Sequence, residues 1–291
     1  MFVRAVPLVL IAALALPGCD ATEKQFVAAS NQAVEALEHE DYTRAETFLN
    51  EAQRLRPADA ETLYYLGVLQ LKRDKPKDAA DALQRAVAAD PTFADAWLNL
   101  AKARYELHDA KGTLDAVAAL LKLDPGHPNG HMLAARVALD QVNPNGAAPD
   151  RVTADKELRA AIAGDPGFAP AYVLLAQVYG QVEAFEAARD VLTEGQRFAP
   201  QSVEIQEALG LTWLDLGRPD RAKTVLAAAA AHPKARPGVH LNYASALLQL
   251  GEKDAAIQAL RTFILQSQGT AHQNDAAVQT AVRMLRHLKG S

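Results

Sequence analysis

Apolar blocks rich in alanine recur along the chain and are interrupted by turn residues about every fifteen positions. The clearest stretch is AETLYYLGVLQLKRDKPKDAADALQRAVAADP, within residues 60–93, and the stretches within 94–127 and 169–202 fit the same frame. Alanine favours helices, whereas the β-branched and aromatic clusters that favour strands are few. The pattern therefore predicts antiparallel helices joined in pairs by short turns.

The helix pairs recur with a fixed period of 34 residues, which is typical of stacked repeats. Only the fourth unit is longer, at 41 residues, because of a seven-residue insertion near 141–151. Pro144, Gly146 and Pro149 predict a loop there, either a tolerated surface insertion or a contact loop for a partner. The seven units are residues 26–59, 60–93, 94–127, 128–168, 169–202, 203–236 and 237–270.

Three columns of the aligned units predict how the two helices of a pair fit together. One column in the first helix is always small: Ala33, Gly67, Ala101, Ala135, Ala176, Gly210 and Ala244. One column in the second helix is nearly always alanine: Ala45, Ala79, Thr113, Ala154, Ala188, Ala222 and Ala256. Four residues later stands a branched aliphatic: Leu49, Leu83, Val117, Leu158, Leu192, Leu226 and Leu260. Small residues allow close approach, and the aliphatic side chain fills the remaining space.

The last segment, residues 271–291, is predicted to close the stack with one more helix. Its apolar residues fall on one helical stripe: Val278, Ala281, Val282, Leu285 and Leu288. Phe263, in a column that is otherwise mostly small, is expected to pack beneath this helix.

These columns resemble the tetratricopeptide repeat, over residues 26–270. Proline ends the second helix of five units, as in that family, because it lacks an N–H group: Pro57, Pro91, Pro125, Pro166 and Pro200. The resemblance implies an all-α fold, a right-handed α-solenoid of seven helix pairs with a C-terminal capping helix. A coiled coil is excluded because turn residues interrupt the helices too often.

The only cysteine in 291 residues, Cys19, follows the apolar run AVPLVLIAALALPG. The run is shorter than a membrane span, which needs about 20 apolar residues, and is typical of a secretory signal. LPGC, residues 16–19, resembles the lipobox of bacterial lipoproteins. This implies a signal peptide over 1–18, and a lipidated cysteine with a short tether over 19–25. The protein would then lie in the bacterial cell envelope, lipid-anchored and facing the periplasm, at either the inner or the outer membrane.

Charge argues against nucleic acid as a partner. The chain has 30 basic and 35 acidic residues, and the signal segment contains only Arg4 of them, so the mature chain would carry a net charge of −6. Proteins that bind nucleic acid instead carry a basic stripe or patch.

No catalytic motif is visible: there is no glycine-rich phosphate loop, GxSxG elbow or catalytic cysteine. His127 and His131 are four apart, as in helical metal pairs, but Pro128 and Gly130 between them prevent a shared helical face. We therefore expect no catalytic residue, metal, cofactor or small-molecule substrate.

The resemblance implies that the first helices line a concave face that binds proteins. Asn99 and Asn242 stand where members of the family often bond a peptide backbone, and Arg136 could anchor a carboxylate. As a set the candidates predict a groove that is more apolar than charged, although the apolar ones could equally be core between helix pairs. The other candidates are Tyr64, Val68, Leu98, Lys102, Tyr105, Met132, Val173, Gln177, Leu211, Leu214, Leu241 and Leu248.

The expected partner is a protein at the envelope, presenting an amphipathic helix or an extended peptide. The clamp that chaperone-binding members use for a C-terminal carboxylate is missing, since its supporting positions read Tyr64, Val68, Asn129 and Leu133. The layout is similar to lipoproteins that assist pilus machines, such as type IV pilus pilotins and tight-adherence lipoproteins. An adaptor that recruits cell-wall hydrolases and another kind of scaffold remain alternatives.

Overall fold

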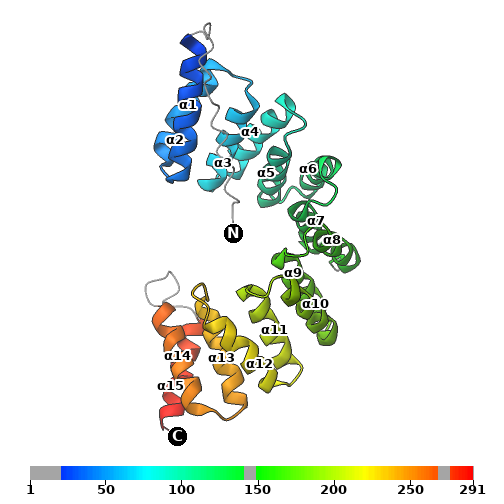
Figure 1. Cartoon of the computed structure of the whole chain (residues 1–291), viewed down its shortest axis with the longest axis vertical. Helices are drawn as coiled ribbons and strands as arrows, with labels where there is room; N and C mark the ends of the chain where they lie inside the picture. Colours follow the sequence, from blue (N-terminus) through cyan, green and yellow to red (C-terminus); the bar gives the residue numbers. More distant parts are fainter. Residues whose placement is uncertain (1–20, 141–148, 268–275, 291) are drawn as a thin grey trace. The chain divides into compact units, whose positions relative to one another are not determined.

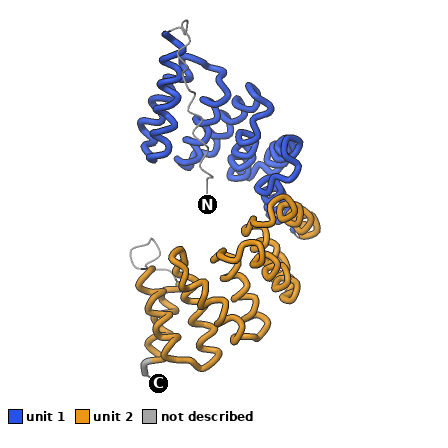
Figure 2. Tube along the Cα trace, in the orientation of Figure 1, with its two compact units in different colours: residues 1–149 blue, residues 150–291 orange. Residues whose placement is uncertain are grey.

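The computed structural model describes residues 21–140, 149–267 and 276–290. These residues form fifteen α-helices and no strand (Figure 1). The chain divides into two compact units, residues 1–149 and 150–291 (Figure 2). Cys19 and the whole of 1–20 lie outside the described residues, as do 141–148 of the predicted insertion.

Unit 1 consists of helix pairs stacked in chain order. The first three first helices each pack against the second helix of their pair, and each second helix contacts the next first helix. The seventh helix, the first of the fourth predicted pair, ends the unit. The helices are α1 (Ala21–Glu38), α2 (Tyr42–Leu55), α3 (Ala60–Lys72), α4 (Pro76–Ala89), α5 (Ala94–Glu106), α6 (Ala110–Leu123) and α7 (Pro128–Asp140).

Unit 2 repeats this arrangement, so the predicted all-α solenoid of helix pairs is confirmed within each unit. Helix α8 packs on α9, and three pairs follow before the terminal helix. The helices are α8 (Arg151–Gly164), α9 (Ala169–Gly180), α10 (Phe185–Phe198), α11 (Val203–Asp215), α12 (Pro219–Ala230), α13 (Pro237–Gln249), α14 (Lys253–Ser267) and α15 (Ala276–Gly290).

Helix α1 begins earlier than the sequence predicts. We expected a tether over 19–25 and a first unit from residue 26, but Ala21 already starts the helix. The added turn contacts a residue far away in the sequence. Glu23 forms an ion pair with Arg56, which follows α2, and the Arg56 guanidinium lies 4.2 Å from the centre of the Phe26 ring.

The turns inside the pairs share one backbone conformation. Six first helices end next to a residue with positive φ: Glu40, Asp74, His108, Glu183, Gly217 and Gly251. The following N–H group donates to a carbonyl in the last turn of the helix, as Lys75 does to Gln70 at 2.9 Å. This pairing satisfies carbonyl groups that a helix end otherwise leaves without partners. Only two of the six residues are glycine, which accepts this conformation without steric cost.

In the six helix pairs that lie within one unit, the three predicted columns form the core between the two helices, as their sizes indicate. All members of the two alanine-like columns and of the aliphatic column are buried. The fit is closest where the small residue is glycine: a Cβ on Gly67 would lie 2.4 Å from Leu83 Cγ, and one on Gly210 would lie 2.4 Å from Leu226 Cγ. The predicted role of these columns in close approach is therefore confirmed.

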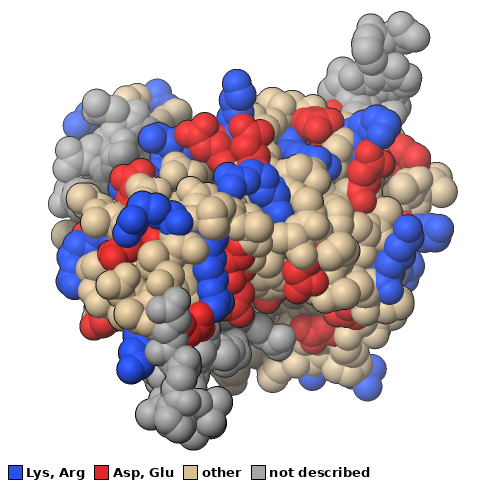
Figure 3. Space-filling model, turned by 90° about the horizontal axis from the view of Figure 1, so that it is seen from above, with Lys and Arg blue, Asp and Glu red and all other residues tan. Residues whose placement is uncertain are grey.

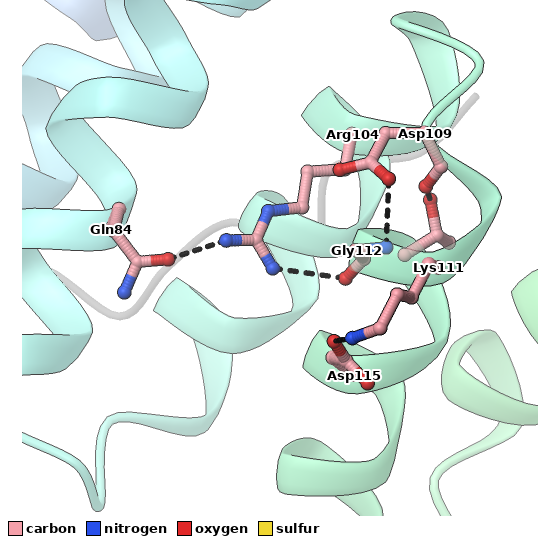
Figure 4. Close-up of polar contacts among 7 residues, drawn as sticks. Gln84, Arg104, Asp109, Lys111, Gly112 and Asp115 are labelled. Atoms are coloured by element: carbon pink, nitrogen blue, oxygen red, sulfur yellow. Dashed lines mark hydrogen bonds and ion pairs between the residues drawn. The ribbon is translucent and has the colours of Figure 1, made fainter.

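Arg104 on α5 joins three helices of unit 1 (Figure 4). Its guanidinium donates to the Gly112 carbonyl in α6 at 3.0 Å and to the side chain of Gln84 on α4. The Gly112 N–H donates to the capping carboxylate of Asp109 at 2.9 Å. A Cβ at Gly112 would lie 2.0 Å from an oxygen of that carboxylate, so a side chain there would require the Asp109 carboxylate to shift.

Helix α15 closes unit 2 in the predicted way. Ala281 is fully buried and Phe263 lies in the same apolar cluster, so the expectation that Phe263 packs beneath the capping helix is confirmed. The stripe residues Val278, Leu285 and Leu288 pack against this cluster. The closing helix thus removes the last apolar face of the stack from water.

Replacing Gly67 with valine should destabilise the chain, because the new side chain would overlap Leu83 in a packed core. Overpacking of this kind costs about 1–3 kcal/mol. The measurement is the urea midpoint of the far-ultraviolet circular dichroism signal. Gly180→Val is the matched control, since no atom lies within 4 Å of a Cβ at Gly180. Equal midpoints for the two variants would contradict the close-approach explanation.

Candidate functional site

Neighbouring first helices lie side by side within each unit, which gives each unit a continuous first-helix face. In unit 1, α1 contacts α3, α3 contacts α5, and α5 contacts α7. In unit 2, α9 contacts α11 and α11 contacts α13. The sequence candidates fall on these two faces, which are described separately.

Two of the large candidates on the unit 1 face lie in the core. Tyr64 is only 5 % exposed and Leu98 only 8 %, and both belong to the apolar cluster between the helix pairs. The Tyr64 ring packs against the rings of Tyr65 and Phe93, with centroids 5.2 and 4.7 Å away. These two side chains are therefore core residues, which is the alternative that the sequence left open for the apolar candidates.

A short chain of polar contacts crosses from α3 to α5. The Asn99 amide donates to the Tyr64 hydroxyl at 3.3 Å, and the Lys102 ammonium donates to the Asn99 carbonyl oxygen at 3.4 Å. Burial raises the pKa of Tyr64, and the neighbouring Asp95 carboxylate raises it further. The phenol is therefore neutral over the physiological pH range and can hydrogen-bond.

The half-buried Lys102 has carboxylates around it. Its burial lowers its pKa, an effect opposed by Asp95 and Glu106. Burial also raises the pKa of Glu106, with Asp74 as a second cause, while Lys102 opposes this shift. Asp95 and Glu106 are exposed, so the face presents negative charge beside its one half-buried ammonium group.

A second contact links α5 to α7. The Tyr105 hydroxyl donates to the Asp140 carboxylate, and burial together with this bond raises the pKa of Tyr105. Arg136 is exposed beside them and lowers the pKa of Tyr105. The remaining candidates here, Val68 and Met132, are half-buried.

The unit 2 face has an acceptor that the sequence did not indicate. Glu207 on α11 accepts from the Asn242 amide at 3.0 Å and pairs with Arg236 at 2.7 Å. Asn99 and Asn242 thus each donate to a side chain 35 residues earlier, on the preceding first helix. This shared spacing is the signal that could have identified Glu207.

The other candidates of unit 2 differ in exposure. Leu211 is 39 % exposed and Gln177 is also exposed. The half-buried ones are Val173, Leu214, Leu241 and Leu248.

The two neighbouring histidines serve the turn before α7. His127 Nδ1 accepts from the Gly130 N–H at 3.3 Å, and His131 Nε2 lies 2.9 Å from the Pro125 carbonyl. Within 21–140, 149–267 and 276–290, no group of three or more His, Cys, Asp or Glu side chains could hold a metal ion.

Positive and negative side chains are interspersed on the face shown in Figure 3, in keeping with a formal net charge of −5. In the part of the chain that the structure describes, no helix has both the length and the apolar character needed to cross a membrane.

Three models of the tetratricopeptide repeat match the chain, over residues 30–92, 70–137 and 135–281. "Cellulose synthase operon protein C" of Xanthomonas axonopodis pv. citri (strain 306) is 28% identical over 240 residues, which are 76% of this chain. This chain spans only 15% of the length of that relative.

Solved structures share the fold at low sequence identity. A tetratricopeptide repeat protein from Parabacteroides merdae has a TM-score of 0.62 at 14% identity, covering 91% of this chain and 99% of that one. PilF of Pseudomonas aeruginosa has a TM-score of 0.59 at 15% identity, covering 78% and 98% of the two chains. PilW, described as a type IV pilus biogenesis factor, has a TM-score of 0.58 at 16% identity, covering 77% and 98%.

The burial of Tyr64 predicts that Tyr64→Asp will destabilise unit 1 by about 3 kcal/mol or more, because it removes a packed ring and buries a charge. The exposed Arg136→Gln should change stability by less than about 0.5 kcal/mol. Urea unfolding of both variants measures the difference. A Tyr64→Asp midpoint equal to that of Arg136→Gln would place Tyr64 on the surface instead.

Proposed function

The chain belongs to the tetratricopeptide-repeat family, and from this premise we propose that it is a non-enzymatic scaffold that binds other proteins on its first-helix faces. We propose further that lipid on Cys19 holds it to a membrane of the bacterial envelope, facing the periplasm, where it assists assembly of a membrane or pilus machine.

The contacts between neighbouring first helices carry the binding proposal. Asn99 to Tyr64 and Tyr105 to Asp140 in unit 1, and Asn242 to Glu207 in unit 2, hold polar side chains in place across helix boundaries. Side chains that are already ordered lose less conformational entropy when a partner binds. The faces are thus suited to an extended or helical segment of another protein.

The partner segment on unit 1 should present polar as well as apolar groups. Tyr64 and Leu98 are unavailable in the core, whereas Arg136, Asp95 and Glu106 are exposed. An exposed arginine can bind a carboxylate with two parallel hydrogen bonds. We therefore assign Arg136 the anchoring role on this face, with Lys102, Tyr105 and Met132 as neighbouring contacts.

The envelope location rests on the resemblance of LPGC, residues 16–19, to a lipobox. The likeness to PilF and PilW supports the fold alone at 15% and 16% identity. The name of the Xanthomonas relative associates that protein with a cellulose synthase operon, and this favours a membrane-machine setting for the present chain.

Cys19→Ser should release the protein from the membrane fraction and abolish its labelling by an alkynyl fatty acid in the bacterial host, because the sulfur that would be acylated is removed. Asp20→Ala, which keeps the thiol, is the control and should stay labelled. The measurement is membrane fractionation with detection of the label. Retained label on Cys19→Ser would refute the lipid anchor.

A photo-crosslinking residue in place of Glu106, exposed on first helix α5, should capture an envelope protein in the native membrane, identified by mass spectrometry. The same residue in place of Asp81, exposed on the second helix α4, is the matched control and should capture much less. A pilus or secretin component captured at Glu106 supports the assembly role, while a cell-wall hydrolase would favour the adaptor alternative. Equal capture at both positions would show that the first-helix face is not the binding site.

A further inference from the structure

One hydrogen bond recurs at the turn that leads into a first helix. A side-chain nitrogen near the start of the helix lies within hydrogen-bond distance of the proline carbonyl six residues earlier in the chain. The pairs are Trp97 Nε1 with Pro91 at 2.9 Å, His131 Nε2 with Pro125 at 2.9 Å, and Gln206 Nε2 with Pro200 at 2.8 Å. In these three repeats, therefore, the polar side chain at this position has an acceptor in the turn.

Helix α13 has a histidine at the same position, but this histidine lacks such an acceptor. His240 is the fourth residue of the seventh repeat, as Trp97 is of the third. It is only 9 % exposed, and among the described residues its buried Nε2 atom has no hydrogen-bond partner. Tyr172 at this position of the fifth repeat is also buried, and its hydroxyl is likewise unpaired within the described ranges. An imidazole, unlike a phenol, can take up a proton near neutral pH.

The helices around His240 do not compensate a positive charge. Burial lowers the pKa of His240 from the ordinary value of 6.5, and among the described residues no carboxylate opposes this shift. Helix α13 packs against α11, α12 and α14. At the end of unit 2 where α13 begins, α12 contributes the alanines 227–230 and α14 the uncharged residues 262–267.

The charged and titratable side chains at this end come from α11 and from the turn before α13. In the described part of the chain they are Glu204, Glu207, His232, Lys234 and Arg236. Glu207 accepts from Asn242 at 3.0 Å and pairs with Arg236 at 2.7 Å, while Glu204 accepts from the Ser202 hydroxyl at 3.0 Å. His232 Nδ1 accepts from the Lys234 N–H at 3.1 Å. Both carboxylates are thus engaged by donors other than His240.

We propose that His240 is a pH-sensitive element that loosens the start of α13 when its imidazole takes up a proton. Protonation places a hydrogen on both ring nitrogens. Nε2 then becomes a buried donor without an acceptor, on a ring that carries a buried charge. The folded packing favours the neutral ring, whereas acid favours any opening of α13 that exposes the ring to water.

His131 has the same position in the fourth repeat and should respond differently. Its Nε2 lies 2.9 Å from the Pro125 carbonyl, which can accept a hydrogen bond from the protonated ring. The same residue type is therefore acid-sensitive where the turn offers no acceptor, and His131 provides a matched control within the chain.

Loosening of α13 would affect the first-helix face of unit 2. Asn242 follows His240 by two residues and donates to Glu207 on α11, which is one of the contacts that carry the binding proposal. The inference therefore concerns the regulation of this face and rests on the proposed function for its biological consequence. The pH response of the fold itself requires no partner.

The first test is an NMR titration of the histidine side chains in the full chain, with His240→Phe to assign the His240 signal. We expect His240 to stay neutral in the folded chain at the pH where an ordinary histidine is half protonated, near 6.5. Half-protonation of His240 at or above that pH would overturn the inference.

The second test is urea unfolding of unit 2, followed by the methyl signals of the fully buried Val239. Because the folded-state pKa of His240 is lowered, the unfolded chain takes up the proton first as the pH falls. Stability is then full above about pH 6.5 and is lost below it. From about pH 7.5 to about pH 5, the unfolding equilibrium constant should rise at least about fivefold more in the unmodified chain than in His240→Phe, the lower limit for a buried donor left unpaired.

His131→Phe should keep the full acid response of unit 2, because it leaves His240 in place. Equal responses of His240→Phe and the unmodified chain would overturn the inference, and His240→Leu repeats the comparison if the phenylalanine variant does not fold. Burial also lowers the pKa of His127 in unit 1, but Val239 reports on unit 2 alone.

Hydrogen exchange of the Asn242 backbone amide tests the link to the first-helix face. After correction for the intrinsic effect of pH on exchange, acid should lower its protection about fivefold or more in the unmodified chain but not in His240→Phe. An equal change in both chains, or no change in either, would overturn the link. Failed capture at Glu106 would count against the proposed function and would leave this pH response unaffected, so the two failures are distinguishable.

Discussion

The close approach of the two helices in each pair is the constraint on which the rest of the structure depends. Where the first helix carries Gly67 or Gly210, the facing leucine occupies the space that a side chain would need, with contacts of 2.4 Å to an added Cβ. The other pairs use alanine at this place, and every member of the column is buried. The contact between the two helices of a pair occupies only one side of the first helix. Its other sides therefore remain available to contact the next first helix or a partner.

This constraint explains why the fold could be predicted. Residues that must be small or aliphatic recur at the same place in each unit, and Phe263 departs from its column where the terminal helix covers it. The start of α1 could not be predicted in this way. Its extra turn contacts Arg56, which lies 33 residues from Glu23 in the sequence. A contact that occurs in only one repeat leaves no recurring residue in the sequence from which it could be predicted.

The sequence indicated which helices carry the candidate site residues, but not how deeply each side chain is buried. The repeat frame assigns Tyr64 and Arg136 to first helices, yet one is in the core and the other is exposed. The Tyr64 ring packs against Phe93, which precedes α5 and belongs to no repeating apolar column. Glu207 was missed because its role follows from Asn242, a residue of the next first helix. A contact between neighbouring repeats can be predicted only when it is known which side chains on the two first helices meet.

In a repeat protein the same position can make a hydrogen bond to its turn in one repeat and none in another. Trp97, His131 and Gln206 differ in chemistry, but each fastens its own turn to the preceding proline carbonyl. At these three turns the position therefore needs a side chain that can hydrogen-bond to the carbonyl, and its exact identity matters less. At Tyr172 the ring is fully buried, and its hydroxyl has no hydrogen-bond partner among the described residues. The position is therefore constrained by burial of the ring in this repeat and by the hydrogen bond to the turn in the other three.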